Sequence, residues 1–279
     1  MRMRGWRAGI LVSWLVPGLL TGCGMEMQSN PGFALDASQA TEHILELRRR
    51  PVATKRPIVV LAGYLDPGFG GTSLAARLRR TVTDPNQVIS IAFFTEKDFD
   101  ACREKVIRQV EAAFPSRDPD FTTEVDVIGI SMGGIVARHA ARDLPDGGKR
   151  LKIARLFTMG APHRGAKLAG LPTLDRKQID MREGSAFLES LNADPTSMDF
   201  EIVAYARLGD TIVGVENTAP PGMNPWWLPN EPLVAAHVAV ASDVRIVADI
   251  IQRLRGDVPF TVGEPIPPPG TKQSASASE

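Results

Sequence analysis

The stretch Val-Asp-Val-Ile-Gly-Ile-Ser-Met-Gly-Gly-Ile-Val-Ala-Arg, residues 125–138, decides the fold. An apolar run typical of a buried strand passes directly into a glycine-rich turn around Ser131, and an alanine-rich helix follows. Glycine at positions 129 and 133 removes Cβ atoms where so sharp a turn would otherwise clash. A strand that turns abruptly into a helix presents its serine hydroxyl at the edge of a sheet, so this stretch predicts both a strand–helix unit and an exposed serine.

The same alternation of apolar runs and helical patterns continues on both sides of this turn. Apolar runs predict strands over residues 57–63, 88–94, 124–130, 153–159 and 201–208. Helical periodicity predicts helices over residues 36–50, 73–82, 98–114, 132–143 and 243–254, with a shorter piece at 186–191. Strands that alternate with helices of about 10–15 residues predict an α/β fold, with a mostly parallel central sheet and helices on both faces.

Two stretches interrupt the alternation and predict small cap insertions. Residues 161–200 lie between two strands, and residues 214–236 contain five prolines and too little regularity for an element. The pair Trp226-Trp227 in the second stretch is a candidate for the rim of a pocket between the insertions. Packing of the two indole rings in the core is the alternative interpretation. Prolines and Ser-Ala repeats predict a disordered tail over residues 256–279.

Composition excludes several classes of protein. The chain has 279 residues with 43% hydrophobic content, enough for one large domain or two small ones. Its 32 basic and 32 acidic residues leave no basic excess for binding nucleic acid. Two cysteines cannot form a disulfide scaffold or a four-thiolate zinc site. No spacing of metal ligands is visible, so we expect neither a metal nor an organic cofactor.

The amino terminus has the layout of a secretory signal. Residues 1–9 hold three arginines and no acid, and residues 10–20 are apolar apart from Ser13. The following Leu20-Thr21-Gly22-Cys23 resembles the lipobox of bacterial lipoproteins. An ordinary signal peptide with a chance cysteine is the alternative.

This resemblance implies an exported, membrane-anchored protein. It implies a signal peptide over residues 1–22, lipidation of Cys23, and a lipid-anchored tether with a short helix over residues 23–56. Gly24 after the cysteine implies the outer membrane, facing the periplasm, if the source is Gram-negative. Several acyl chains, at about 0.8 kcal/mol per buried methylene, hold a protein stably at a membrane.

A serine hydroxyl becomes a nucleophile only when a neighbouring base takes its proton. Of the four histidines, His43 precedes the sheet and His139 lies on the helix behind the serine, so we expect both at the surface or in packing. His163 follows the fourth predicted strand, and His237 lies between the last predicted strand and the last helix. These last two are the candidate bases.

The base in turn needs a carboxylate to fix its tautomer and stabilise its cation. Asp210 ends a buried strand upstream of His237, and this strand-end position favours it. The competing acids lie in the insertion at 161–200 or just beyond the strand, and they are Asp175, Asp180, Asp194, Asp199 and Glu216.

These motifs resemble the α/β-hydrolases, most closely bacterial lipases and related serine esterases, over residues 57–255. Besides the turn at 129–138, the similarity rests on Leu-Ala-Gly-Tyr at 61–64 and Thr-Met-Gly-Ala-Pro-His-Arg-Gly at 158–165. Lipases commonly carry His-Gly after the first strand, whereas this chain has Ala62-Gly63. The resemblance implies an α/β-hydrolase catalytic domain over residues 57–255.

The resemblance also implies a role for each candidate residue. In the family's order of nucleophile, acid and base, the catalytic residues are Ser131, Asp210 and His237. His163 does not fit this order and is expected to orient a loop or line the pocket rim. The remaining implied positions are the oxyanion-hole amides of Tyr64 and Met132 and the nucleophile-elbow glycines, Gly129 and Gly133.

The implied activity is that of an esterase or lipase, a serine hydrolase that cleaves carboxylic esters through an acyl-enzyme. Its expected partners are an ester or lipid substrate and, through Cys23, a membrane. One alternative is a phospholipase, thioesterase or polyester depolymerase with the same triad. A second, of a different class, is a non-catalytic envelope lipoprotein that keeps the fold for binding.

Overall fold

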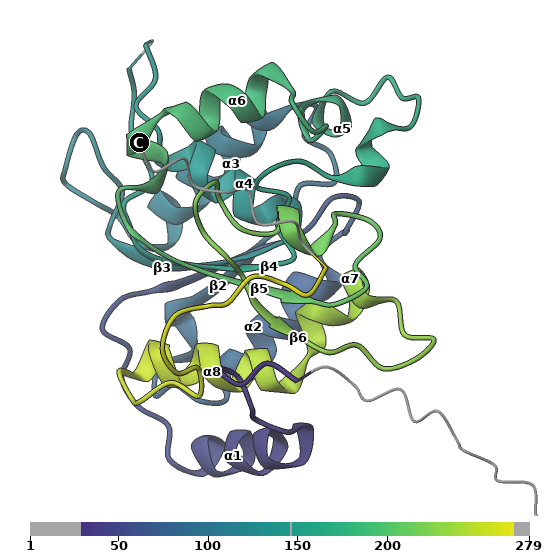
Figure 1. Ribbon diagram of the computed structural model, residues 1–279. Helices are drawn as coiled ribbons and strands as arrows, with labels where there is room; N and C mark the ends of the chain where they lie inside the picture. Colours follow the sequence, from purple (N-terminus) through teal and green to yellow (C-terminus); the bar gives the residue numbers. More distant parts are fainter. Residues whose placement is uncertain (1–28, 146, 271–279) are drawn as a thin grey trace, which may run out of the picture.

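The computed structural model describes residues 29–145 and 147–270, and its centre is a parallel six-stranded sheet (Figure 1). The strands stand in the order β2-β1-β3-β4-β5-β6, and every neighbouring pair is parallel. Their bounds are β1 (Ile58–Leu61), β2 (Val88–Ile91), β3 (Val125–Ile130), β4 (Ile153–Met159), β5 (Glu201–Arg207) and β6 (Trp226–Leu228). The predicted α/β fold with a parallel sheet is confirmed, and the turn from β3 into a helix has the α/β-hydrolase arrangement.

Helices cover both faces of this sheet, as Figure 1 shows. Helices α3, α4, α5 and α6 lie on one face; α2 and α8 lie on the other, and α1 packs outside α8. The α-helices are α1 (Ala37–Arg49), α2 (Phe69–Arg79), α3 (Phe99–Ala113), α4 (Met132–Ala141), α5 (Arg176–Asp180), α6 (Ala186–Ala193), α7 (Ala236–Ala239) and α8 (Val244–Arg255). Short 3₁₀ helices are η1 (Pro85–Gln87), η2 (Lys167–Gly170), η3 (Pro195–Met198), η4 (Val215–Asn217) and η5 (Val240–Ser242).

The core is divided between these two faces because successive side chains of a strand point to opposite sides. In β1, Ile58 and Val60 pack toward α1, α2 and α8, whereas Val59 and Leu61 pack toward α3 and α4. All four are buried. A strand buried on both faces explains why the sequence shows continuous apolar runs here instead of alternation.

Strand β6 lies in the stretch 214–236, for which the sequence predicts no element. Only three residues form it, and Pro225 and Pro229 stand on either side. Because proline is typical of turns, the sequence around these three residues favours a loop over a strand. Trp226 packs in the core, and Trp227 is buried and donates its indole N–H to the Ile266 carbonyl. The predicted location of both tryptophans at a pocket rim is therefore wrong.

Helix α2 begins at Phe69, four residues before the predicted start at Ser73. The Asp66 carboxylate accepts hydrogen bonds from the amides of Gly68, Gly70 and Gly71, which satisfies donors that the start of a helix leaves free. The sequence does not predict this start because glycine has low helix propensity.

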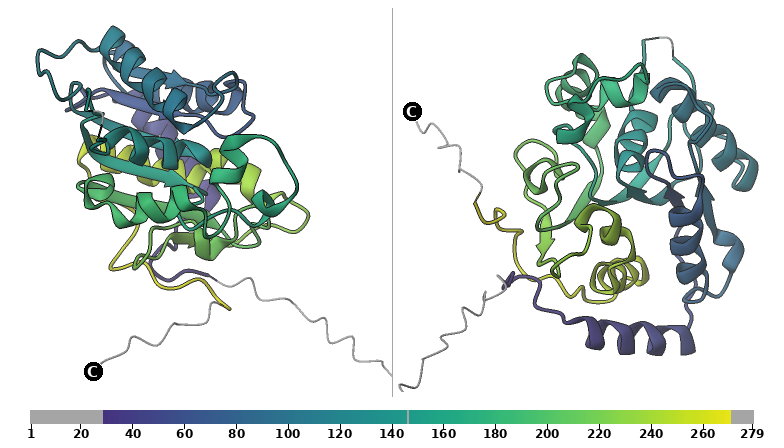
Figure 2. Two further views of the ribbon diagram at one scale, coloured as in Figure 1. Left: turned by 90° about the horizontal axis from the view of Figure 1, so that it is seen from above. Right: turned by 90° about the vertical axis from the view of Figure 1, so that its right-hand side faces the viewer.

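The two ends of the described chain run side by side along β6 (Figure 2). The Val262 amide donates to the Gly32 carbonyl, and the Asn30 amide group donates to the Trp227 carbonyl. The structure thus differs from the predicted disordered tail, since buried Asp249 accepts hydrogen bonds from residues 260 and 261 and holds the first part of it. Residues 271–279 of that tail lie outside the described residues.

The predicted signal peptide and Cys23 also lie outside the described residues. Helix α1, predicted over 36–50, is present, and Ala40, Ile44 and Leu47 form its buried side as expected. Among the helices at 29–145 and 147–270, none combines the length and apolar character needed to cross a bilayer.

Candidate active site

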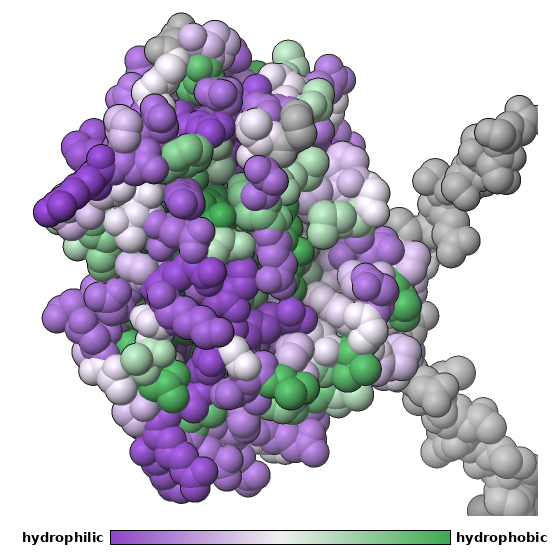
Figure 3. All heavy atoms as spheres, turned by 90° about the vertical axis from the view of Figure 1, so that its left-hand side faces the viewer, coloured by the Kyte–Doolittle hydropathy of each residue, from purple (hydrophilic) through white to green (hydrophobic). Residues whose placement is uncertain are grey.

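The carboxyl ends of the strands meet at one edge of the sheet, on the right of Figure 1. The opposite edge, seen in Figure 3, carries a band of hydrophilic side chains across its middle. Ion pairs there join the beginnings of strands to their neighbours, such as Arg56 with Glu124 and Arg253 with Glu201. The predicted catalytic residues Ser131, Asp210 and His237 lie at the other edge, where the carboxyl ends of the strands meet.

Ser131 occupies a strained turn between β3 and α4. Its φ of 49° and ψ of −122° are sparsely populated for a residue with a side chain. A Cβ on Gly133 would lie 2.3 Å from the Leu61 carbonyl oxygen, and one on Gly129 would lie 2.5 Å from Gly134. The predicted elbow glycines are therefore required because the backbone of neighbouring segments fills the space of a side chain.

Ser131, His237 and Asp210 form one chain of hydrogen bonds. The Ser131 Oγ lies 2.9 Å from His237 Nε2, and His237 Nδ1 lies 2.8 Å from Asp210 Oδ2. Because a carboxylate only accepts, the imidazole proton belongs on Nδ1, which leaves Nε2 free to accept from the serine hydroxyl. The structure thus brings together three side chains that are up to 106 positions apart in the sequence.

Asp210 is fixed from two sides. It follows β5 and Gly209, whose φ of 77° favours glycine. Its Oδ1 accepts hydrogen bonds from the amides of Ile212 and Val213, at 3.0 and 2.9 Å, while Oδ2 faces the imidazole. Its side chain is 2% exposed, so water does not compete for these bonds. The carboxylate therefore has one defined orientation toward His237.

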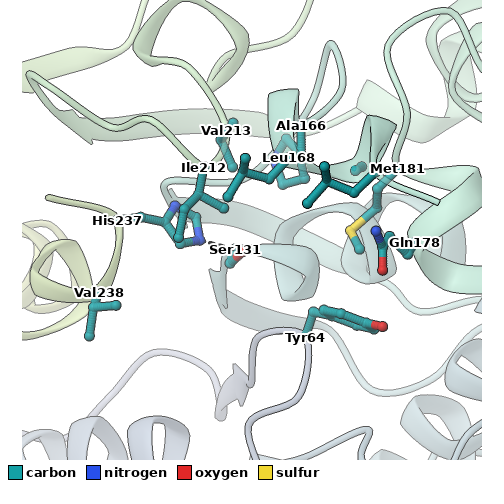
Figure 4. Close-up of a pocket in the computed structure, with 13 residues that line it drawn as sticks. Tyr64, Ser131, Ala166, Leu168, Gln178, Met181, Ile212, Val213, His237 and Val238 are labelled. Atoms are coloured by element: carbon teal, nitrogen blue, oxygen red, sulfur yellow. Dashed lines mark hydrogen bonds between the residues drawn. The ribbon is translucent and has the colours of Figure 1, made fainter. Parts of the chain in front are cut away.

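A pocket of about 400 Å³ opens beside Ser131 and His237. In Figure 4 it extends from His237 past Ser131 toward Met181 and Gln178, with Tyr64 at its lower side. The other lining residues are all apolar: Pro162, Ala166, Leu168, Ala169, Leu171, Ile212, Val213 and Val238. The insertion 161–200 forms one wall as expected, but no lining residue comes from 214–236.

Met132 and Tyr64, the two residues predicted to supply oxyanion-hole amides, are neighbours of Ser131. Met132 is the first residue of α4, and its amide has no partner within the helix. Gly63 passes so close that a Cβ on it would lie 3.4 Å from the Ser131 Cβ, which brings the following Tyr64 to the same place. The Tyr64 phenol donates to Asp175, and burial together with this bond raises the pKa of Tyr64 to about 12. Tyr64 thus lines the same pocket as Ser131, and Met132 follows Ser131 in the chain, while the role of their amides stays a prediction.

His163 lies behind the pocket wall and does not line the pocket, which corrects its predicted place at the rim. It has no exposed surface, and its ring contacts Arg138 and Thr158. The neighbouring Pro162 lines the pocket instead. Since position after a strand does not tell which way a side chain points, the sequence could not separate these two residues.

The other two histidines have the packing roles expected of them. His139 is buried, bonds Asp100 and packs against Phe99 and Phe187. His43 packs edge-on against Phe260. The described residues hold no cluster of three or more His, Cys, Asp or Glu side chains that could bind a metal ion.

Sequence reasoning missed Arg138, the fully buried arginine on α4. It bonds the ring of His163, the side chains of Asn192 and Ser197, and the carbonyl oxygens of Leu191 and Ser197. A signal was present in the sequence, because Arg138 stands among apolar residues in the alanine-rich helix that follows Ser131.

No family model matches the chain, and no curated protein matches it by sequence. Among solved structures, it is similar to phospholipase PlaB from Legionella pneumophila in complex with thio-NAD, with 13% identity, a TM-score of 0.45, and coverage of 60% of this chain and 44% of that one. It is also similar to the esterase domain of a Rhodothermus marinus protein, with 17% identity, a TM-score of 0.43, and coverage of 71% and 87%. It is similar, too, to the lin2722 gene product of Listeria innocua, with 11% identity, a TM-score of 0.45, and coverage of 71% of this chain and 92% of that one. The chain thus spans less than half of the length of the phospholipase.

Proposed function

We propose that this chain is a serine hydrolase that cleaves carboxylic esters through an acyl-enzyme. The observation that carries the proposal is the continuous hydrogen bonding of Ser131, His237 and Asp210 at the mouth of an apolar pocket. The strained elbow at Ser131 and the nearby backbone amides support the same conclusion. Nucleophile, base and orienting acid are the parts that acyl transfer requires.

The reaction begins when His237 Nε2 takes the Ser131 proton as the hydroxyl oxygen attacks the ester carbonyl carbon. The carbonyl oxygen becomes an oxyanion, which the amides of Met132 and Tyr64 stabilise. Loss of one such donor costs about 3 kcal/mol of transition-state stabilisation in other enzymes. His237 then returns the proton to the leaving alcohol as the carbon–oxygen bond breaks, and the acyl group stays on Ser131.

Water completes the cycle. His237 accepts a proton from a water molecule as its oxygen attacks the acyl-enzyme, and it gives that proton to the Ser131 oxygen as the acid leaves. Asp210 keeps the imidazole in one tautomer throughout and stabilises the imidazolium that forms twice. Its two bonds from the amides of Ile212 and Val213 support this orientation.

The pocket favours esters with uncharged, apolar acyl groups. Its lining contains no lysine, arginine, aspartate or glutamate. The nearby cation Lys167 is paired with Glu216 at 2.7 Å, so it offers little to an anionic substrate. Leu168, Leu171 and Val238 line the pocket and are also exposed, so the apolar surface continues outward from the site. An acyl chain gains about 0.8 kcal/mol for each methylene that it buries there.

Hydrolysis of p-nitrophenyl esters tests the proposal. We expect the protein to cleave p-nitrophenyl butyrate, and Ser131→Ala to abolish the activity. Ser38→Ala, a change at an exposed serine of α1, is the matched control and should be fully active. A folded wild-type protein that cleaves no ester between butyrate and palmitate contradicts the proposal and favours a binding protein.

We further propose that Cys23 anchors this enzyme to the bacterial envelope. The sequence Leu-Thr-Gly-Cys at 20–23, after a basic and then an apolar segment, supports this. Cys23→Ala should release the protein from the membrane fraction on cell fractionation. Unchanged partitioning of Cys23→Ala contradicts the lipid anchor, and it leaves the proposed ester hydrolysis untouched.

A further inference from the structure

Arg138 is a buried cation at the back of the candidate site. It lies on α4, the helix that starts directly after Ser131, and its side chain has no exposed surface. In the described part of the chain no carboxylate pairs with it, because the nearby Asp194 pairs with Arg142 instead. Burial lowers the pKa of Arg138 to about 10. An arginine held without a counter-ion is costly unless neutral groups satisfy its donors.

Neutral acceptors from two other segments satisfy these donors. One terminal nitrogen bonds His163 Nδ1 at 3.2 Å and Asn192 Oδ1 at 2.9 Å. The other bonds the Ser197 hydroxyl at 3.0 Å and the Leu191 carbonyl at 3.2 Å. Arg138 therefore joins the nucleophile's helix to the segment after β4 and to the end of the insertion.

The bonding fixes the state of His163. Arginine can only donate, so Nδ1 of His163 accepts, and its proton lies on Nε2. That nitrogen lies 3.2 Å from the Thr158 hydroxyl on β4. The side-chain amide of Asn192 donates to the backbone carbonyl of His163 at 3.0 Å and thereby closes a ring of bonds among the three residues. His163 is held from both ring nitrogens and from its backbone.

The turn that His163 holds contacts the site directly. Gly160, with φ of 64°, lies next to the imidazole, since a Cβ on it would lie 3.4 Å from His237 Nδ1, a van der Waals distance. Pro162, two residues on, lines the pocket. The Ser131 amide bonds the carbonyl of Met159, the residue just before this turn. A shift of residues 160–163 therefore moves the surface behind the imidazole relative to the serine.

We propose that Arg138 and His163 are positioning residues that hold the turn at 160–163 against His237 and so set the alignment of the imidazole with Ser131. This inference rests on the proposed ester hydrolysis and adds residues that touch neither substrate nor reacting atoms. Alignment matters because misplacement of a catalytic group by about 1 Å can lower a rate by about 100-fold.

Two substitutions at one position test this. His163→Leu removes both ring bonds, whereas His163→Gln offers an oxygen to Arg138 and an N–H to Thr158. With p-nitrophenyl acetate, whose acyl group is too short to follow the pocket wall, we expect His163→Leu to lower kcat by about 10- to 100-fold with little change in KM. His163→Gln should recover most of this loss.

His139→Gln is the matched control. His139 follows Arg138 on α4, is also buried, and bonds Asp100 on α3, with no bond to the turn at 160–163. We expect it to lose stability without a loss of kcat. Should His163→Leu fail to fold, Thr158→Val, which removes only the acceptor of His163 Nε2, replaces it and should also lower kcat.

Two results overturn the proposal while leaving the hydrolase intact: a folded His163→Leu or Thr158→Val with wild-type kcat, or a kcat that falls equally in the His163 and His139 variants in step with their stability. A wild-type protein that neither cleaves esters nor reacts with a fluorophosphonate overturns the proposed function and this inference together. The wild-type measurement thus separates the two failures.

Discussion

Two histidines at the same edge of the sheet show how neighbours decide what an imidazole can do. His237 has a carboxylate at Nδ1 and a serine hydroxyl at Nε2, and it borders an open pocket. His163 has an arginine at Nδ1 and a threonine hydroxyl at Nε2, and it has no exposed surface. Both are bonded at both nitrogens, yet their electrostatic surroundings are opposite.

The difference explains why only one of them is suited to act as a base. A carboxylate stabilises the imidazolium that forms on proton uptake, whereas a cation destabilises it. Burial, together with Arg138 and Arg164, holds the pKa of His163 well below its usual value. His163 therefore stays neutral and forms hydrogen bonds with Arg138 and Thr158, while His237 is placed to exchange a proton with Ser131.

The largest expected effect separates the two histidines by rate. His237→Ala removes the proton acceptor and should lower kcat by about 10⁶-fold, as triad losses do elsewhere. Ser131→Ala should lose as much, and the double variant no more, because the two groups act as a unit. Steady-state and single-turnover hydrolysis of p-nitrophenyl butyrate measure this. Losses that multiply in the double variant contradict a shared step.

Asp210→Asn is expected to lower kcat by about 10⁴-fold. The amides of Ile212 and Val213 need an acceptor, so the asparagine oxygen should face them and its NH₂ group should face His237. His237 must then accept at Nδ1 and carry its proton on Nε2, where it cannot take one from Ser131. The same ester assay tests this, and near-wild-type activity in a folded Asp210→Asn argues against Asp210 as the orienting acid.

The smallest effect sharpens the comparison through stability. The folded state keeps His163 neutral. The contribution of His163 to the free energy of unfolding is therefore complete at pH values above the ordinary histidine pKa, and it is lost as the pH falls below that pKa. Only the unfolded chain then gains the proton. The slope approaches about 1.4 kcal/mol per pH unit for one proton. Urea unfolding at pH 7 and pH 5.5 should show a smaller loss for His163→Gln than for wild type, and equal losses contradict the assignment.

The part of the site that follows from local sequence was predictable. The apolar run, the glycines at 129 and 133 and the helix that follows specify the elbow through steric rules that act within about ten residues. Asp210 was predictable from its place at the end of a strand, and His237 from its place between the last predicted strand and the last helix, in the order of nucleophile, acid and base. The hydrogen bonds of His237 to Asp210, 27 positions away, and to Ser131, 106 positions away, depend on how the chain folds and required the structure.

The predictions that were wrong, or were not made, concern side-chain direction and very short elements. Trp226 and Trp227 belong to a strand of three residues between prolines, a length at which propensity carries little information. His163 and Pro162 are neighbours in sequence, but only Pro162 reaches the pocket. Arg138 was overlooked because helix periodicity places it among core positions, where a charged residue is seldom expected.

Reaction with a fluorophosphonate probe, followed by mass spectrometry of the labelled peptide, tests the central claim most directly. Ser131, activated by His237, should carry the label in the folded wild-type protein, and His237→Ala should lose it while His139→Gln keeps it. A folded wild-type protein that stays unlabelled, or one labelled at another serine, contradicts the assignment of Ser131 and His237 as nucleophile and base.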